Sequence, residues 1–143
     1  RCIAATARSG IGARYDRAVA AMQRALDDLG IDATRGAPEA AYCPGDHSLR
    51  ADAKLAGLAQ RVTASGALVS GVLPVADRGE LADVLADVYD CLDYPFDPAS
   101  VGTVADAGGD DRFERVAAAL TDRLARVPAG SGASVEELRS GQT

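Results

Sequence analysis

The chain has 143 residues, which suits one domain or part of one, and its 48% hydrophobic content is enough for a buried core. A net charge of −6, with 4% aromatic residues and no tryptophan, argues against a nucleic-acid-binding surface, which needs basic stripes and stacking rings. No apolar run approaches the length of a membrane span and no signal segment opens the sequence, so we expect no membrane association.

The first third of the chain predicts a strand, a helix and an irregular passage. Residues 1–9 are compatible with a short strand, and residues 13–29 carry apolar positions at the three- and four-residue spacing of one buried helix stripe. Gly30 is a typical helix-ending residue. Residues 31–46 hold several glycines and prolines, which predicts an irregular passage with a short strand at 31–35.

The middle of the chain has the clearest strand signals. Residues 47–51, 54–62 and 67–76 predict three antiparallel strands joined by tight turns. Pro74 is expected near a strand end or a sheet edge, because proline has no N–H to donate to a neighbouring strand.

Two helices are predicted in the last third, over residues 78–92 and 110–126. Asp77 and Glu80 have the spacing of a capping box at the start of the first. The apolar stripe that we expect this helix to bury consists of Leu81, Val84, Leu85, Val88 and Leu92.

These elements predict an α+β fold, a mainly antiparallel or mixed sheet with helices packed on it. Residues 1–127 are assigned to that domain, and residues 128–143, which begin with a Pro, Gly and Ser-rich stretch, to a flexible C-terminal tail.

Lys54 is the one lysine among 15 basic residues and lies in the apolar run 53–62. A buried lysine is costly unless it is paired, and Gly57 leaves the strand without a side chain where a ligand could approach the backbone. A flexible ammonium beside bare backbone suits an anionic or carbonyl-bearing ligand. The alternative is that Lys54 begins the strand and extends into water.

The cysteines are odd in number, and their spacing matches no zinc or disulfide framework. With a single histidine in the chain, we expect no metal site and a reducing, cytoplasmic compartment. Cys43 lies in a predicted loop, where it is either a nucleophile activated by a nearby lysine or a small half-buried residue. Cys2 and Cys91 are expected to serve packing.

The run K-L-A-G-L-A-Q-R, residues 54–61, resembles the lysine strand of the lipoate–protein ligase and octanoyltransferase family, which commonly reads K-(I/V)-(A/S)-G-(S/I)-A-Q-R. The surroundings of this run have the order found in the family. A helix ending LDDLGIDA and a cysteine-containing loop YCPGDHS precede the run, and the strand VSGVL follows it. The likeness covers roughly residues 1–125 and implies a catalytic domain of the biotin/lipoate ligase fold.

The resemblance implies that Lys54 contacts the acyl carbonyl and phosphate of an acyl-adenylate, or the acyl carbonyl in transfer enzymes. Arg61 matches a family arginine near the phosphate or the acceptor. Seven positions separate the two residues, so an unbroken strand would send them to opposite faces. Either Gly57 hosts a β-bulge, or only Lys54 faces the ligand.

The same resemblance places Gly57, Leu58 and Ala59 along the acyl chain and ribose, with Ser70 and Gly71 at the family's His-Gly positions. Serine in place of that histidine is a departure from the family. The family's R-R-x-(S/T)-G-G-(G/R) loop is also absent. We therefore expect the second half of a catalytic domain, whose other half precedes it or belongs to a second polypeptide.

The leading functional interpretation is a cytoplasmic ligase that uses ATP and Mg²⁺ to activate lipoate or octanoate and passes the acyl group to a lysine of a lipoyl carrier domain. One alternative is a Cys43-dependent transferase that takes octanoate from acyl carrier protein without ATP. The other is a non-catalytic subunit related to this family, which binds an acyl carrier or a second subunit.

Overall fold

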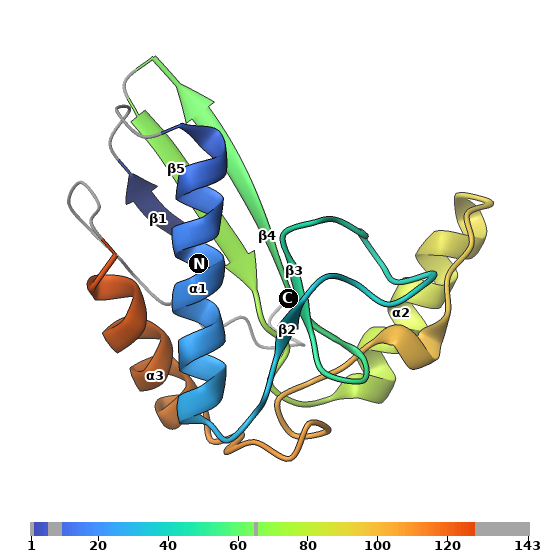
Figure 1. Ribbon diagram of the computed structural model, residues 1–143. Helices are drawn as coiled ribbons and strands as arrows, with labels where there is room; N and C mark the ends of the chain where they lie inside the picture. The colour runs from blue at the N-terminus through green and yellow to red at the C-terminus, as the bar shows by residue number, and fades with distance from the viewer. Residues whose placement is uncertain (1, 6–9, 65, 128–143) are drawn as a thin grey trace, which may run out of the picture.

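The computed structural model describes residues 2–5, 10–64 and 66–127, in which one five-stranded sheet has the order β1-β5-β4-β3-β2 (Figure 1). Every neighbouring pair in the sheet is antiparallel, and a single parallel bridge joins Lys54 to Val101. The predicted α+β class is confirmed. The strands are β1 (Cys2–Ala5), β2 (Thr34–Arg35), β3 (Ser48–Arg50), β4 (Lys54–Thr63) and β5 (Gly66–Val72).

The longest pairing joins β4 to β5, from Gly57 opposite Val72 to Thr63 opposite Gly66. The predicted meander of three antiparallel strands is confirmed by β3, β4 and β5. The last of these strands ends at Val72, so Pro74 lies just beyond a strand end, as its missing N–H requires.

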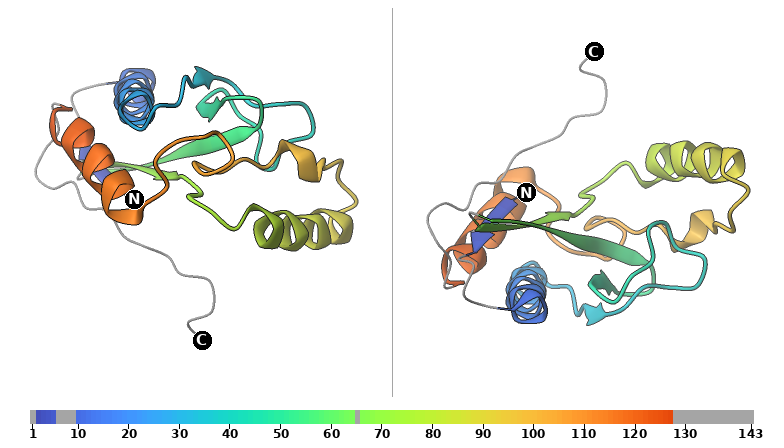
Figure 2. Two further views of the ribbon diagram at one scale, coloured as in Figure 1. Left: turned by 90° about the horizontal axis from the view of Figure 1, so that it is seen from below. Right: turned by 90° about the horizontal axis from the view of Figure 1, so that it is seen from above.

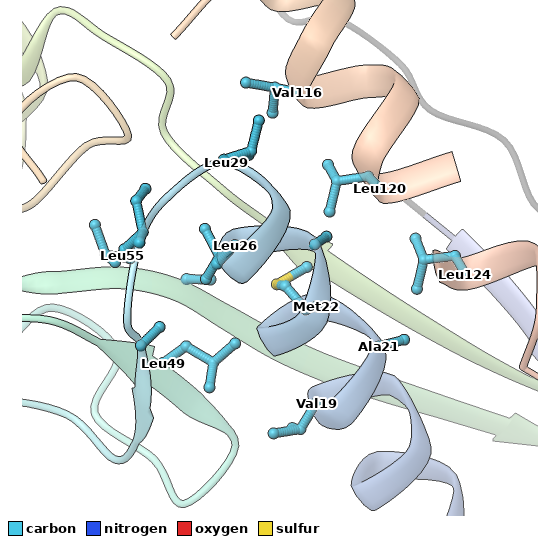
Figure 3. Packing of buried hydrophobic residues seen from close by; sticks show 14 of the residues in the cluster. Val19, Ala21, Met22, Leu26, Leu29, Leu49, Leu55, Val116, Leu120 and Leu124 are labelled. Atoms are coloured by element: carbon cyan, nitrogen blue, oxygen red, sulfur yellow. The ribbon is translucent and has the colours of Figure 1, made fainter. Parts of the chain in front are cut away.

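Two helices build the core on one face of the sheet. The first, α1 (Ile11–Asp28), ends before Gly30, which has a φ of +86°, as predicted for a helix-ending glycine. The last, α3 (Phe113–Ala125), packs beside α1 (Figure 2). Figure 3 shows their apolar side chains meeting those of the strands. Large members of this buried cluster are Val19, Met22, Leu26, Leu49, Leu55, Val116, Leu120 and Leu124.

The second helix, α2 (Arg78–Cys91), lies on the opposite side of the sheet from α1 and is displaced to one side (Figure 2). The prediction that its apolar stripe is buried is wrong, since Val84, Val88 and Leu92 are 55%, 47% and 66% exposed. Ala82 is the buried residue of this helix. Periodicity identifies an apolar face, but another element must be present to bury it.

Two further predictions near α2 are wrong. Asp77 precedes the helix with a φ of +59° and forms no side-chain cap, since a capping residue normally has an extended backbone and this one is left-handed. Cys91 is exposed rather than packed, since it lies on a helix with few neighbours. After Cys91 the chain passes through the 3₁₀ turn η1 (Pro98–Ser100) and returns to α3. The Cys2 side chain and the predicted tail at 128–143 lie outside the described residues.

Candidate functional site around Lys54

Lys54 is among the most deeply buried side chains of the described chain, with 1% of its surface exposed. Its ammonium Nζ donates to the backbone oxygens of Tyr42 at 2.8 Å and Cys43 at 2.7 Å. The same nitrogen lies 4.5 Å from the centre of the Tyr42 ring, within reach of a cation–π interaction. The alternative of a lysine extending into water is wrong, because the loop at 42–43 covers the ammonium and supplies its acceptors.

Within the described part of the chain, the surroundings of Lys54 contain no counter-ion. Among the described residues no carboxylate forms an ion pair with it, and its two acceptors are neutral carbonyls. Burial therefore lowers the pKa of Lys54, and the nearby Cys43 partly opposes that change. Burial also raises the pKa of the adjacent Tyr42, which favours its neutral hydroxyl form.

A break in strand register sets the direction of the Lys54 side chain. Leu49 lies opposite Ala56, but Arg50 lies opposite Lys54, so Leu55 has no partner in the β3–β4 pairing. One extra residue reverses the alternation of side chains between the two faces. The predicted bulge therefore exists, but it lies at Leu55 and not at Gly57.

As a result, Lys54 lies over Gly57. A Cβ atom added at Gly57 would be 3.4 Å from both Cε and Nζ of Lys54. Alternation along β4 places Ala59 and Arg61 on this same face, although Arg61 lies about 20 Å further along the strand. Cross-strand pairing adds Ser70, which lies opposite Ala59.

Two of the predicted ligand-lining residues lie on the other face. Leu58 and Gly71 are opposite each other in the β4–β5 pairing. A Cβ atom at Gly71 would come within 3.0 Å of Met22 Cε, which belongs to α1. The structure therefore brings Gly57, Ala59 and Ser70 onto the face of Lys54 and separates Leu58 and Gly71 from them.

The face that carries Lys54 is partly apolar and open in the described part of the chain. Val72, opposite Gly57, is 63% exposed, and Leu68 on the same face is 37% exposed. An open apolar strip that leads to a buried cation can accommodate a molecule with an apolar chain and a polar head.

Cys43 lies next to Lys54 with a φ of +40° and an exposed side chain. Its N–H donates to the Tyr89 hydroxyl at 2.6 Å, and the same hydroxyl lies 3.9 Å from Cys43 Sγ. Tyr42 and Tyr89 also belong to this cluster, and neither was among the predicted site residues. Tyr89 is on α2, 46 residues from Cys43, and no sequence pattern connects the two.

In the described ranges, no group of three or more His, Cys, Asp or Glu side chains is arranged to hold a metal ion. Nor does any helix found there have the length and apolar character needed to cross a membrane.

No protein-family model and no curated protein matches the sequence. Solved structures do match. A crystal structure of lipoate-protein ligase A bound with ATP is 18% identical, with a TM-score of 0.66, and the match covers 88% of this chain and 50% of that one. A T. acidophilum protein solved with bound lipoic acid is 18% identical, with a TM-score of 0.66, and the match covers 88% of this chain and 49% of that one. The chain thus spans about half the length of these structures, and it has the lipoate–protein ligase fold over that half.

Proposed function

We propose that this chain is the second half of the catalytic domain of an enzyme that attaches lipoate or octanoate to a lysine of a lipoyl carrier domain. Lys54 carries this proposal, because it is a buried ammonium with neutral acceptors and no carboxylate partner among the described residues. A buried cation in this state favours a ligand that brings negative charge or develops it. The likeness in fold to ligases solved with ATP and with lipoic acid supports the same proposal.

In this proposal the acyl chain lies along the open strip formed by Gly57, Val72 and Leu68, and its carbonyl oxygen accepts from Lys54. The two backbone acceptors of Lys54 leave one of its three N–H groups for that oxygen. When the amine of the carrier lysine attacks the acyl carbon, negative charge builds on this oxygen and the ammonium stabilises it. Gly57 allows the approach, because it has no side chain.

ATP, when bound, would supply the activation of the free acid, in which the carboxylate takes the adenylate group with release of pyrophosphate and the carrier lysine later displaces AMP. The charge of the uncompensated ammonium would also attract the phosphate of this mixed anhydride, and Gly57 gives the Lys54 side chain the room to reach it. Mg²⁺ prefers carboxylate oxygens, and no such cluster lies at Lys54 within the described residues, so we assign it no step. We place the reaction in the cytoplasm, because the exposed free thiols of Cys43 and Cys91 suit a reducing compartment.

The test is the intact mass of a lipoyl carrier domain after incubation with octanoate and the full-length protein that contains this chain, with and without MgATP. We expect an acyl mass gain only with ATP. The Lys54→Met variant should slow the gain at least about 100-fold, as expected when a positioned charge donor is removed. Melting curves report whether the variant is folded, and full activity in a folded Lys54→Met protein would rule out the proposed role.

A second candidate is a Cys43-dependent transferase, and the exposure of the thiol beside Lys54 favours it. The Cys43 thiolate would attack the thioester of octanoyl acyl carrier protein, releasing the carrier thiol and forming an acyl-cysteine. The amine of the acceptor lysine would then take the acyl group and release the Cys43 thiol. The same mass measurement tests this candidate, with octanoyl acyl carrier protein as the donor and no ATP. An acyl mass gain that survives Cys43→Ser would exclude the candidate. Tight binding of the carrier domain without turnover from either donor would instead indicate a non-catalytic subunit.

A further inference from the structure

We infer that Tyr89 is a positioning residue, whose hydroxyl holds Cys43 beside Lys54 and orients the Cys43 thiol. This inference rests on the proposed acyl-transfer site and adds α2 to it. The Tyr89 hydroxyl accepts the Cys43 N–H at 2.6 Å, which leaves its own proton free to point toward Cys43 Sγ, 3.9 Å away.

Cys43 needs such support because its backbone is in the left-handed region, with a φ of +40°. A non-glycine residue there is strained and persists only where its surroundings fix it. Here Tyr89 holds the N–H and Lys54 holds the carbonyl oxygen of this one residue. Both fixed groups therefore depend on side chains that belong to the proposed site.

Aromatic contacts hold the Tyr89 ring in turn. It stacks on Phe96 at a centroid distance of 5.0 Å and meets Tyr94 edge-on at 6.1 Å. The same segment reaches the loop a second time, because the Asp97 N–H donates to the Ala40 oxygen at 2.9 Å. The loop around Cys43 is thus attached to residues 89–97 at two points.

The position of α2 makes Tyr89 more than a packing residue. Ala82 is the residue that this helix buries, and Val84 and Val88 on it are about half exposed. A helix with so little buried surface gains little from packing on the core, so its polar contacts carry a large share of its attachment. Tyr89 therefore couples the position of α2 to the geometry of Lys54 and Cys43.

The test compares Tyr89→Phe with Tyr94→Phe in the full-length protein. Phenylalanine at 89 keeps the stacked ring and removes only the hydroxyl. Tyr94 is a matched control, because its ring contacts Tyr89 but its hydroxyl forms no hydrogen bond among the described residues. Peptide mass spectrometry follows the alkylation of Cys43 by iodoacetamide. The exposed Cys91, which lies on α2 like Tyr89, is the internal reference.

In Tyr89→Phe we expect the alkylation rate of Cys43 relative to Cys91 to fall about threefold or more at neutral pH, as expected for loss of one hydrogen bond. Tyr94→Phe should behave as wild type. An unchanged or higher ratio in Tyr89→Phe, or an equal effect in Tyr94→Phe, overturns the inference.

Amide hydrogen exchange supplies an independent measurement that needs no acyl transfer. The Cys43 amide should exchange about three- to tenfold faster in Tyr89→Phe than in wild type, because its acceptor is gone. If Tyr89→Phe does not fold, hydrogen exchange in the wild-type protein still tests the inference. A Cys43 amide that is not protected from exchange would contradict its hydrogen bond to Tyr89. Neither measurement depends on activity, so failure of the proposed acyl transfer remains distinguishable from failure of this inference.

Discussion

At the scale of single residues, the geometry of the site depends on Gly57. The Lys54 side chain runs over this glycine, with Cε and Nζ each 3.4 Å from the place where a Cβ atom would stand. That distance is an ordinary contact for one methyl group. A branched side chain would put further atoms into the volume that the ammonium occupies.

This predicts different outcomes for Gly57→Ala and Gly57→Val. We expect Gly57→Ala to keep most of the proposed acyl-transfer activity, and Gly57→Val to reduce kcat/KM at least about tenfold by displacing the ammonium. Valine suits a strand, so the free energy of unfolding of Gly57→Val should change by no more than about 1–2 kcal/mol. Steady-state kinetics and urea unfolding measure the two effects, and equal kcat/KM in both variants would show that the approach over Gly57 is not used.

The sequence was sufficient to single out Lys54 and Gly57, because one is the unique lysine and the other interrupts an apolar strand. It was not sufficient to predict what surrounds them. The acceptors of Lys54 are backbone oxygens of a loop, which any residue types at 42 and 43 would supply. Tyr89 acts across 46 positions, and single-sequence patterns carry no signal at that distance.

At the scale of elements, α2 and α3 show how far periodicity can be used. Both carry apolar residues at helical spacing, and in α3 the apolar residues Val116, Leu120 and Leu124 are buried. In α2 the residues Val84, Val88 and Leu92 of the corresponding stripe are exposed, because this helix makes few contacts with the other described elements. The register break at Leu55 could not be predicted from the sequence either, since it depends on which backbone groups of β3 and β4 pair.

Two valine substitutions measure this difference between the helices. Val88 on α2 is 47% exposed and Val116 on α3 is 2% exposed. We expect Val116→Ala to lower the free energy of unfolding by about 2 kcal/mol, from lost burial and the cavity that remains. Val88→Ala should lower it by less than about 0.5 kcal/mol. Urea unfolding measures both free energies, and the slope of the unfolding free energy against urea concentration should be the same in both variants. An equal loss of unfolding free energy in the two variants would mean that Val88 and its helix α2 are buried in solution.

At the scale of the whole molecule, the core is closed on the α1 face of the sheet by contacts between helices far apart in sequence. Asp28 at the end of α1 accepts from two guanidinium nitrogens of Arg123 on α3, each at 2.6 Å. The hydrogen bonds from Arg123 lower the pKa of Asp28 below its usual value. The ion pair therefore joins the two helices whose apolar faces form the core.

The sign of that pKa change gives a pH-dependent prediction. A carboxyl group with a lowered pKa in the folded state adds stability at pH values above its unfolded pKa, and this contribution disappears as pH falls through the folded pKa. We expect Asp28→Asn to be less stable than wild type near neutral pH, and to approach wild type as the pH falls below the usual aspartate pKa and through the lowered pKa of the folded state.

Asp27→Asn is the matched control for this prediction, because it removes the same charge from the neighbouring position. The Asp27 carboxylate forms no ion pair among the described residues. Urea midpoints at neutral and acidic pH should separate Asp28→Asn from wild type only at neutral pH and leave Asp27→Asn close to wild type throughout. A difference in urea midpoint between Asp28→Asn and wild type that persists in acid would contradict this prediction. It would have to come from packing, since the carboxyl group is protonated in acid and no longer forms the ion pair. The ion pair would then not be what joins α1 to α3.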